Sequence, residues 1–126
     1  MARKAFSAKD IPVAGPYSQA VEAGGFVYLS GQLPIVPSTG KLVEGCVACQ
    51  TTQCFANIKA VLEAAGLGFD DVVKATVFLR DMADFPAMNE VYREQFSAPY
   101  PARSTIGILA LPLDARVEIE LIAKRP

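Results

Sequence analysis

The sequence predicts a single α/β domain in which a mixed β-sheet carries two helices on one face. The chain has 126 residues, which is about the length of one domain. Its apolar patterns occur in the order β-hairpin, helix, strand, helix, strand, strand. No repeat, linker or low-complexity tract interrupts that order. Residues 1–126 are therefore expected to form one domain.

The first pair of strands is predicted from a turn signal. In the stretch VEAGGFVYLSG, the dipeptide Gly24-Gly25 separates two segments rich in residues that favour strands. Glycine adopts the positive φ angles that a two-residue hairpin turn requires. The sequence therefore predicts a hairpin with strands at Gln19–Ala23 and Phe26–Ser30.

Two helices are predicted from apolar residues at helical spacing. The first is expected over Val47–Ala65, where Gly66 supplies the left-handed residue that ends it. The second is expected over Phe85–Phe96, with Asp84 as its N-cap and Pro86 in its first turn. The apolar stripes consist of Val47, Cys54, Ile58, Val61, Leu62 and Ala65 in the first helix, and of Phe85, Met88, Val91, Tyr92 and Phe96 in the second.

Three further strands are expected in DVVKATVFLR, RSTIGIL and RVEIELIA. The first of them alternates, which places Val73, Ala75, Val77 and Leu79 on one face. The last two are taken as an antiparallel pair joined by ALPLDA. The segment TGKLVEG, which precedes the first helix, is expected to be a loop.

The sheet face away from the helices is expected to be uncovered and partly apolar. Val72, Thr76, Phe78, Gly107 and Leu109 are its predicted members. The chain as a whole is 52% hydrophobic, with a mean hydropathy of +0.28. An exposed apolar face of this kind is usually buried against a partner. The sequence therefore predicts an oligomer.

Charge and composition exclude several classes of function. The 12 basic and 13 acidic residues are spread along the chain, so no nucleic-acid binding is expected. No apolar run is long enough to cross a membrane. The N-terminal MARKAFSAKD lacks the apolar core of a secretory signal, and the cysteine number is odd. A cytoplasmic location is therefore expected.

The cysteines of CVACQTTQC suggest a metal or redox site only weakly. Cys46 and Cys49 form a C-x-x-C motif, but a zinc ion needs four ligands and the chain has no histidine and only one further cysteine. Cys54 falls on the apolar stripe and is expected in the core. No metal site is predicted, and whether these thiols have a redox role stays open, with adventitious oxidation favoured.

The polar residues near the C-terminus form the candidate site. Alternation within the last two strands allows Arg103, Thr105 and Glu118 to line a cleft on the face away from the helices. A guanidinium binds a carboxylate through two parallel hydrogen bonds, and a glutamate activates water. The alternative is purely structural: cross-strand ion pairs between Arg103 and Glu120, or between Arg116 and Glu118.

The chain resembles the reactive intermediate deaminase family, also called the RidA/YjgF family. The resemblance rests on seven segments that occur in the family's order over nearly all of the chain. They are GPYSQA (15–20), VYLSGQ (27–32), NIKAVLEAAG (57–66), VVKATVFLRDM (72–82), MNEVY (88–92), PARST (101–105) and RVEIELIA (116–123).

The resemblance implies a chorismate-mutase-like fold and a homotrimer with clefts between its subunits. It also implies hydrolysis of 2-imino acids such as 2-iminobutanoate, or of enamine tautomers such as 2-aminoacrylate, to 2-keto acids and ammonia. Enzymes that use pyridoxal phosphate release these reactive compounds from serine and threonine. The family needs no metal or organic cofactor.

The resemblance also assigns roles to individual residues. Arg103 matches the arginine that holds the substrate carboxylate, and Glu118 matches the glutamate that orients the attacking water. Tyr17 matches a tyrosine that closes over the ligand, and Ser30 matches a serine that lines the pocket. Gly31 is expected to contribute backbone contacts beside that serine.

One departure from the family and one alternative function remain. Thr105 stands where many members carry a cysteine, and it is expected to be tolerated because the contacts there are made mostly by backbone groups. The alternative is a non-catalytic module that binds a small carboxylate, such as a 2-keto acid or an amino acid, with a regulatory or protein-interaction role. Some members are described as ribonucleases, which the balanced charge of this chain does not favour.

Overall fold

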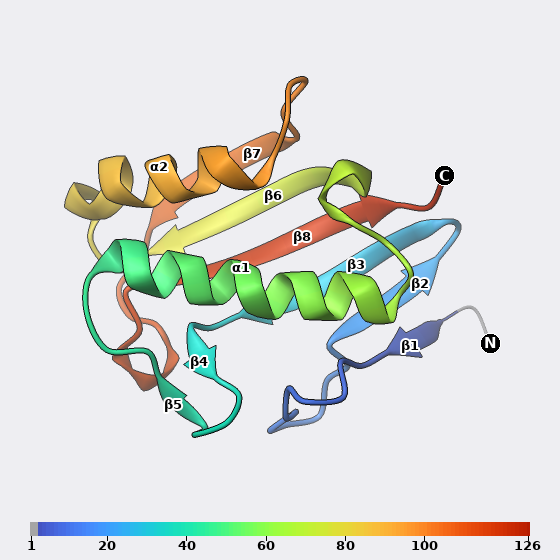
Figure 1. Cartoon of the computed structure of the whole chain (residues 1–126), viewed down its shortest axis with the longest axis horizontal. Coiled ribbons are helices and arrows are strands. Elements are labelled where there is room, and N and C mark those ends of the chain that lie inside the picture. Colours follow the sequence, from blue (N-terminus) through green and yellow to red (C-terminus); the bar gives the residue numbers. More distant parts are fainter. Residues whose placement is uncertain (1–2) are drawn as a thin grey trace.

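The central sheet combines strands from both ends of the chain (Figure 1). The computed structural model describes residues 3–126. Its six-stranded sheet has the order β1-β2-β3-β8-β6-β7, and β4 pairs with β5 in a separate ribbon. The strands are β1 (Lys4–Phe6), β2 (Ala20–Ala23), β3 (Phe26–Gln32), β4 (Ile35–Val36), β5 (Lys41–Leu42), β6 (Val72–Leu79), β7 (Ala102–Gly107) and β8 (Val117–Lys124).

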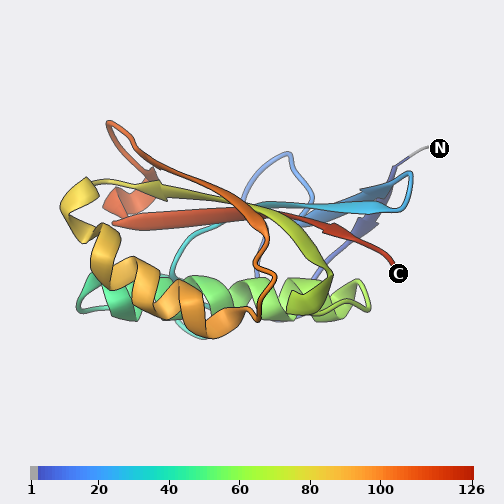
Figure 2. The same cartoon turned by 90° about the horizontal axis from the view of Figure 1, so that it is seen from above.

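Both helices lie on the same side of the sheet, as Figure 2 shows. They are α1 (Val47–Ala64) and α2 (Phe85–Gln95). The core fills the space between the helices and the inward-facing side chains of the strands, where Ile58, Val77 and Ile119 are fully buried. The predicted fold class, a mixed sheet with two helices on one face, is confirmed.

Helix α1 matches its prediction to within one residue. Every member of its predicted apolar stripe, Cys54 included, is buried. Gly66 follows the helix with φ of +75°, a conformation that other residues adopt only with strain. The amide of Leu67 donates to the carbonyl of Leu62 at 2.9 Å, which satisfies one of the last free carbonyls of the helix.

Helix α2 also lies where it was predicted, but Asp84 does not cap it through its side chain. Its carboxylate instead accepts two hydrogen bonds from Arg116, Nε to Oδ2 at 3.2 Å and Nη2 to Oδ1 at 2.9 Å. A bidentate pair with a guanidinium is stronger than a single capping bond. The contact fastens the start of α2 to the residue that precedes β8.

The two C-terminal strands are not neighbours, so the predicted antiparallel pairing is wrong. Strand β6 lies between them, antiparallel to β8 and parallel to β7. The connection β6–α2–β7 is a crossover through a helix, and such a connection places its two strands parallel in one sheet. Strand β7 therefore becomes the edge of the sheet, with Arg103 opposite Ala75.

The predicted hairpin is confirmed, whereas the start of β6 differs from its prediction. Ala23 lies opposite Phe26, and the intervening Gly24 and Gly25 have φ of +60° and +85°. In β6, the register shifts after Val72, which is buried, while Val73 is 43% exposed. The irregularity reverses the faces predicted for these two valines.

Three short strands were not predicted. Strand β1 precedes the hairpin and adds an outer strand to it, and β4 and β5 form a ribbon before α1. Residues Lys41–Leu42 of this ribbon lie in the segment that was expected to be a loop. Two- and three-residue strands are too short to show an alternating pattern, so periodicity alone could not find them.

In the part of the chain that the structure describes, neither α1 nor α2 lies on the outer face of the sheet, as Figure 2 shows. Tyr28 and Ile106 are 42% and 44% exposed there, and the half-buried Phe78 lies opposite Ile106. Gly107 does not belong to this face, because its register partner Leu79 is fully buried in the core on the helix side. Leu109 lies beyond β7 and is fully exposed. Within residues 3–126, neither helix has the length and apolarity that crossing a bilayer requires.

Candidate functional site

Arg103 lies under helix α2 on the edge strand β7. Its guanidinium carbon is 4.6 Å from the centre of the Tyr92 ring and 5.4 Å from that of Phe85. Its Nη1 donates a hydrogen bond to Oδ1 of Asn89 at 2.7 Å. Stacking on aromatic faces is a favourable environment for a planar cation. These contacts fix the orientation of the guanidinium plane.

This position corrects the predicted face for Arg103 and Thr105. Their register partners on β6 are Ala75 and Val77, whose side chains are fully buried against the helices. Neighbouring residues across two parallel strands point to the same face. Arg103 and Thr105 therefore lie on the helix side of the sheet and not on the outer face. The aromatic rings of α2 explain why a charged side chain is accommodated there.

A hollow of about 530 Å³ opens beside the guanidinium. Two buried hydroxyls on the helix side, those of Tyr92 and Thr105, have no hydrogen-bond partner within residues 3–126. Burial raises the pKa of the Tyr92 phenol, so it stays protonated at neutral pH. The hollow is lined by Asn89, Tyr92, Arg93, Tyr100, Pro101 and Arg103. Arg103 with Thr105, Asn89, Tyr92 and Phe85 is called the arginine cluster below.

Glu118 lies on the outer face, near the start of the central strand β8. It is half-buried on β8 and lies opposite Phe78 of β6. Burial raises the pKa of its carboxyl, and the neighbouring charge of Glu120 raises it further. A carboxyl whose pKa is shifted toward neutrality both accepts and returns protons effectively.

Gly31 leaves the space that the Glu118 carboxyl occupies. A Cβ added to Gly31 would lie 2.9 Å from Cδ and 3.0 Å from Oε2 of Glu118. The pairing of β3 with β8 is irregular between Leu29 and Gln32, at the same place. This close approach requires glycine on β3, since any side chain would displace the carboxylate.

Tyr17 and Ser30 lie near Gly31 and belong with it to the surroundings of Glu118. Tyr17 lines a hollow of about 750 Å³ with Ser30, and a narrow one of about 60 Å³ with Gly31. The Tyr17 side chain is 49% exposed, whereas the Ser30 hydroxyl donates to the carbonyl of Ser18 at 2.6 Å. Glu118 with Gly31, Ser30 and Tyr17 is called the glutamate cluster below.

The structure thus divides the predicted site residues into two clusters. On β6, Arg103 is level with Ala75 and Glu118 with Phe78, which is about 10 Å farther along the strand. The two side chains also lie on opposite faces of the sheet. Within one copy, the predicted single cleft containing Arg103, Thr105 and Glu118 does not form.

The structural ion pairs proposed as the alternative do not form either. Arg116 binds Asp84, and neither Glu118 nor Glu120 takes part in an ion pair within residues 3–126. Arg103 likewise has no acidic partner within that range. Arg103 is thus a cation on the helix side of the sheet that contacts two aromatic rings and the Asn89 amide. Its other guanidinium nitrogens can still donate hydrogen bonds to an anion.

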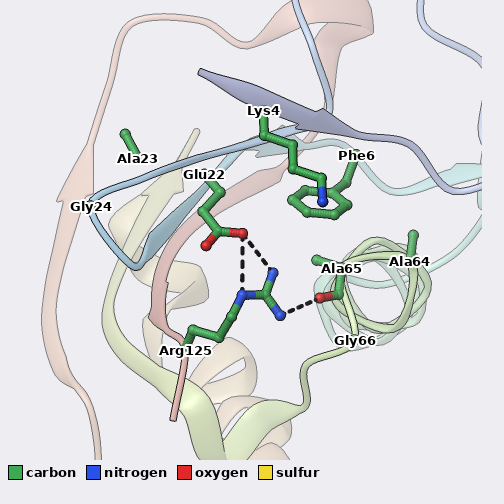
Figure 3. Close-up of a pocket in the computed structure, with 9 residues that line it drawn as sticks. All are labelled: Lys4, Phe6, Glu22, Ala23, Gly24, Ala64, Ala65, Gly66 and Arg125. Atoms are coloured by element: carbon green, nitrogen blue, oxygen red, sulfur yellow. Dashed lines mark hydrogen bonds and ion pairs between the residues drawn. The ribbon is translucent and has the colours of Figure 1, made fainter. Parts of the chain in front are cut away.

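Figure 3 shows a further hollow, of about 650 Å³, between the β1–β2 edge and the end of α1. Two of its charged groups bind one another: Arg125 donates to Glu22 at 2.8 Å, and it also donates to the carbonyl of Ala65 at 2.8 Å. The amine of Lys4 lies 5.3 Å from the centre of the Phe6 ring. The hydrogen bond from Arg125 lowers the pKa of the Glu22 carboxyl. The contacts of Arg125 therefore connect the sheet to the end of α1, and the only carboxylate among the described residues that line this hollow, that of Glu22, is already paired.

Sequence reasoning missed the partners of Arg103. Asn89 was not among the predicted site residues, yet it accepts a hydrogen bond from Nη1 of the guanidinium at 2.7 Å. Tyr92 and Phe85 were assigned only to the apolar stripe. The spacing of Phe85, Asn89 and Tyr92 at intervals of four and three residues, which puts them on one helix face, was the available signal.

Comparison with known proteins shows extensive similarity. The family model described as Endoribonuclease L-PSP matches residues 7–125. A RutC family protein of Pyrococcus horikoshii is 53% identical over 109 residues, which cover 86% of each chain. A 2-iminobutanoate/2-iminopropanoate deaminase of Dermatophagoides farinae is 52% identical over 108 residues, 86% of this chain and 84% of that one. The chloroplastic Reactive Intermediate Deaminase A of Arabidopsis thaliana is 48% identical over 122 residues, 96% of this chain and 65% of that one.

Solved structures resemble the whole fold. RidA from an Antarctic Psychrobacter is 47% identical with a TM-score of 0.91, and the match covers 97% of this chain and 99% of that one. E. coli TdcF with bound serine is 40% identical with a TM-score of 0.90, and the match covers 98% and 99% of the two chains.

Proposed function

From the membership of this chain in the reactive intermediate deaminase (RidA/YjgF) family, we propose that it hydrolyses 2-imino acids and their enamine tautomers, such as 2-iminobutanoate and 2-aminoacrylate. The products are 2-keto acids and ammonia. Relatives about half identical to this chain carry deaminase names. The observation that carries the proposal is the guanidinium of Arg103, oriented by two rings and Asn89 beside an open hollow.

Arg103 binds the substrate carboxylate in this proposal. A planar guanidinium matches a carboxylate through two parallel hydrogen bonds and stays charged at any working pH. Its hydrogen bond to Asn89 uses Nη1, which leaves donors on the other nitrogens. The stacking rings restrict the guanidinium, so the substrate binds in one orientation with less loss of freedom.

Glu118 activates the water. Its carboxylate accepts a proton as the water oxygen bonds to the electrophilic imine carbon, and the C=N electrons move to nitrogen. Return of that proton to nitrogen gives a carbinolamine, with a hydroxyl and an amino group on one carbon. Glu118 then takes the hydroxyl proton and delivers it to the amino nitrogen, so the carbon–nitrogen bond breaks, ammonia leaves and the carbonyl forms. Proton transfer by a positioned carboxyl accelerates such a step, and the raised pKa of Glu118 suits both directions.

The two clusters meet between copies of the chain. One copy presents the arginine cluster on the helix side and the glutamate cluster on the outer face, so the complete cleft takes one cluster from each of two neighbours. The bare outer face, with the exposed Tyr28 and Ile106, supplies apolar surface for that contact. A closed homotrimer, with three such clefts, satisfies this head-to-tail arrangement.

Thr105 contributes mainly its backbone to the cleft, and Tyr17, Ser30 and Gly31 enclose the ligand from the other copy. One domain over residues 1–126 is part of the proposal, supported by a family model that spans residues 7–125. A cytoplasmic location also stays a prediction, since a relative from Arabidopsis is named as chloroplastic.

A second candidate is a module that binds a small carboxylate without catalysis. The related E. coli TdcF structure with bound serine favours it, because serine carries the same carboxylate that Arg103 would bind. Binding needs only the arginine cluster, whereas hydrolysis also needs Glu118. The family description as an endoribonuclease gains no support from a net charge of −1.

The test is hydrolysis of 2-iminobutanoate, generated in the assay from threonine by a threonine dehydratase. Wild type is expected to exceed the buffer rate, and Arg103→Ala to lose about two to four orders of magnitude in kcat/KM, because each hydrogen bond to a charged group contributes about 1.5–3 kcal/mol. Arg80→Ala, which removes a surface arginine bonded to Asp114, is the matched control and should keep full activity.

Other outcomes are decisive against the proposal. A wild type no faster than buffer would refute the enzyme for this substrate. Titration with serine and 2-oxobutanoate would then test the binding module. Full activity in Arg103→Ala would refute the assigned role of the arginine.

A further inference from the structure

Cys46 and Cys49 form an exposed dithiol at the beginning of α1. Their Sγ atoms are 3.0 Å apart, and both side chains are exposed. Cys46 is the N-cap of the helix, and its Sγ accepts a hydrogen bond from the amide of Cys49 at 3.4 Å. The helix geometry therefore holds the two sulfurs together without help from any other segment.

The surrounding chain leaves space beside the sulfur of Cys49. Gly45 precedes the helix with φ of +114°, and a Cβ added there would lie 3.3 Å from Sγ of Cys49. Glycine at position 45 thus allows the positive φ angle of the turn and leaves space for the Cys49 sulfur. On the other side, Cys49 lines a hollow of about 440 Å³ with mostly small and apolar residues. They are Val43, Ala48, Thr52, Gln53 and Ala56.

Cys46 is chemically distinct from the buried Cys54. Hydrogen bonds from the Cys49 thiol and from the amides of the first helical turn lower the pKa of the Cys46 thiol. The positive end of the helix dipole acts in the same direction. Burial raises the pKa of Cys54, which keeps that thiol protonated. Cys46 is thus the nucleophile of the pair, and Cys54 is inert.

From the paired, exposed sulfurs at this helix start, we propose that Cys46 and Cys49 are a redox-active dithiol that exchanges with small disulfides. This site is separate from both clusters of the deaminase site. Neither cysteine belongs to the arginine or the glutamate cluster, so the proposal does not depend on the proposed function.

The exchange takes place in two displacements. The Cys46 thiolate attacks one sulfur of a disulfide R–S–S–R, a mixed disulfide forms and R–S⁻ leaves. The Cys49 thiol then loses its proton and attacks the Cys46 sulfur, so that the Cys46–Cys49 bond forms and a second R–S⁻ leaves. Two protein thiols are oxidised, one small disulfide is reduced, and the two protons end on the departing thiolates.

The test uses the full chain and oxidised glutathione. After incubation and acid quenching, the protein is denatured, treated with N-ethylmaleimide and weighed by intact mass spectrometry. Before oxidation, all three cysteines should take the label. After oxidation, only Cys54 should take it, with the mass of two hydrogens lost and no glutathione retained.

Single variants separate a dithiol from ordinary surface oxidation. Cys46→Ser keeps a good N-cap, so the helix start is preserved. In Cys46→Ser and in Cys49→Ser, the remaining cysteine should retain glutathione as a mixed disulfide. Alkylation of native Cys46 by iodoacetamide should also slow several-fold in Cys49→Ser, which lacks the partner thiol.

Three results would overturn the proposal. They are wild-type protein that keeps three labelled cysteines, wild-type protein that retains glutathione on Cys46, and wild-type protein that cross-links into covalent dimers. In each case, no stable disulfide forms between Cys46 and Cys49 of the same chain.

Discussion

The arginine cluster and the glutamate cluster are built in opposite ways. In the arginine cluster, side chains of one helix hold one cation: two rings stack on it and an amide binds it. In the glutamate cluster, backbone makes the site, since an irregular strand and a glycine leave room for a half-buried carboxyl. The arginine cluster fixes the orientation of the Arg103 guanidinium, and the glutamate cluster raises the pKa of the Glu118 carboxyl.

Under the proposed function, this difference places substrate binding and proton transfer at two separate positions in one copy of the chain. A carboxylate ligand needs a rigid fork of donors, which the covered side of the sheet provides. A water-activating carboxyl needs a raised pKa, which partial burial and the charge of Glu120 give to Glu118, and access to substrate, which the outer face of the sheet allows. One copy of the chain therefore holds the two clusters apart, and in the proposed homotrimer each cleft would combine one cluster from each of two copies.

The sharpest way to separate the clusters is Glu118→Gln. The amide keeps the shape of the side chain but accepts no proton, so kcat should fall by about 100- to 10 000-fold. Binding of 2-oxobutanoate, measured by calorimetry, should stay near that of wild type because Arg103 is intact. Equal loss of binding and of kcat would show that Glu118 also contributes to ligand binding, which contradicts separate roles for the two clusters.

A smaller effect is expected from Gly31→Ala. The added methyl would lie 2.9 Å from Cδ of Glu118, so the carboxyl must move while the backbone remains in place. Activity should fall by about tenfold, since misplacing a catalytic group by about 1 Å is costly. Gly68→Ala is the matched control, because no atom lies within 4 Å of its added Cβ. Equal activities in the two variants, with equal thermal stability, would contradict this role of Gly31.

The smallest expected effect is a shift in the pH dependence of kcat. Glu118 must be ionised to accept a proton, so activity should fall as pH decreases through its raised pKa. Glu120→Gln removes a neighbouring negative charge that raises this pKa, and the acid limb of the kcat profile should therefore move to lower pH. Glu63→Gln, on exposed α1 surface, should leave the limb in place. A limb that moves to higher pH in Glu120→Gln would be inconsistent with the assignment.

The sequence predicted the helices well because their signals are local. The stripe of α1 and the glycine after it are contained within twenty residues, and both were confirmed. The face of Arg103 was wrong because it depends on which strand pairs with β7 and on what α2 places above it. Polarity suggested the outer face for a guanidinium, whereas the rings of Phe85 and Tyr92 make the helix side favourable.

The residue identities at the site came from the family resemblance, and their arrangement came from the fold. Alternation along β8 correctly put Glu118 on the outer face. The separation of Glu118 from Arg103 is a property of the strand order, in which β6 lies between their strands. Asn89 escaped notice because its spacing from Phe85 and Tyr92 indicates a shared helix face but not which residue of the fold lies opposite that face.

Mixing two inactive variants tests the central claim most directly. Arg103→Ala and Glu118→Gln would be unfolded, combined in equal amounts and refolded together, beside each variant refolded alone and a wild-type control. If each cleft takes Arg103 from one copy and Glu118 from its neighbour, about a quarter of the clefts in randomly mixed assemblies contain both residues, and that share of wild-type activity should return. No recovery in the mixture, with active refolded wild type, would contradict the account.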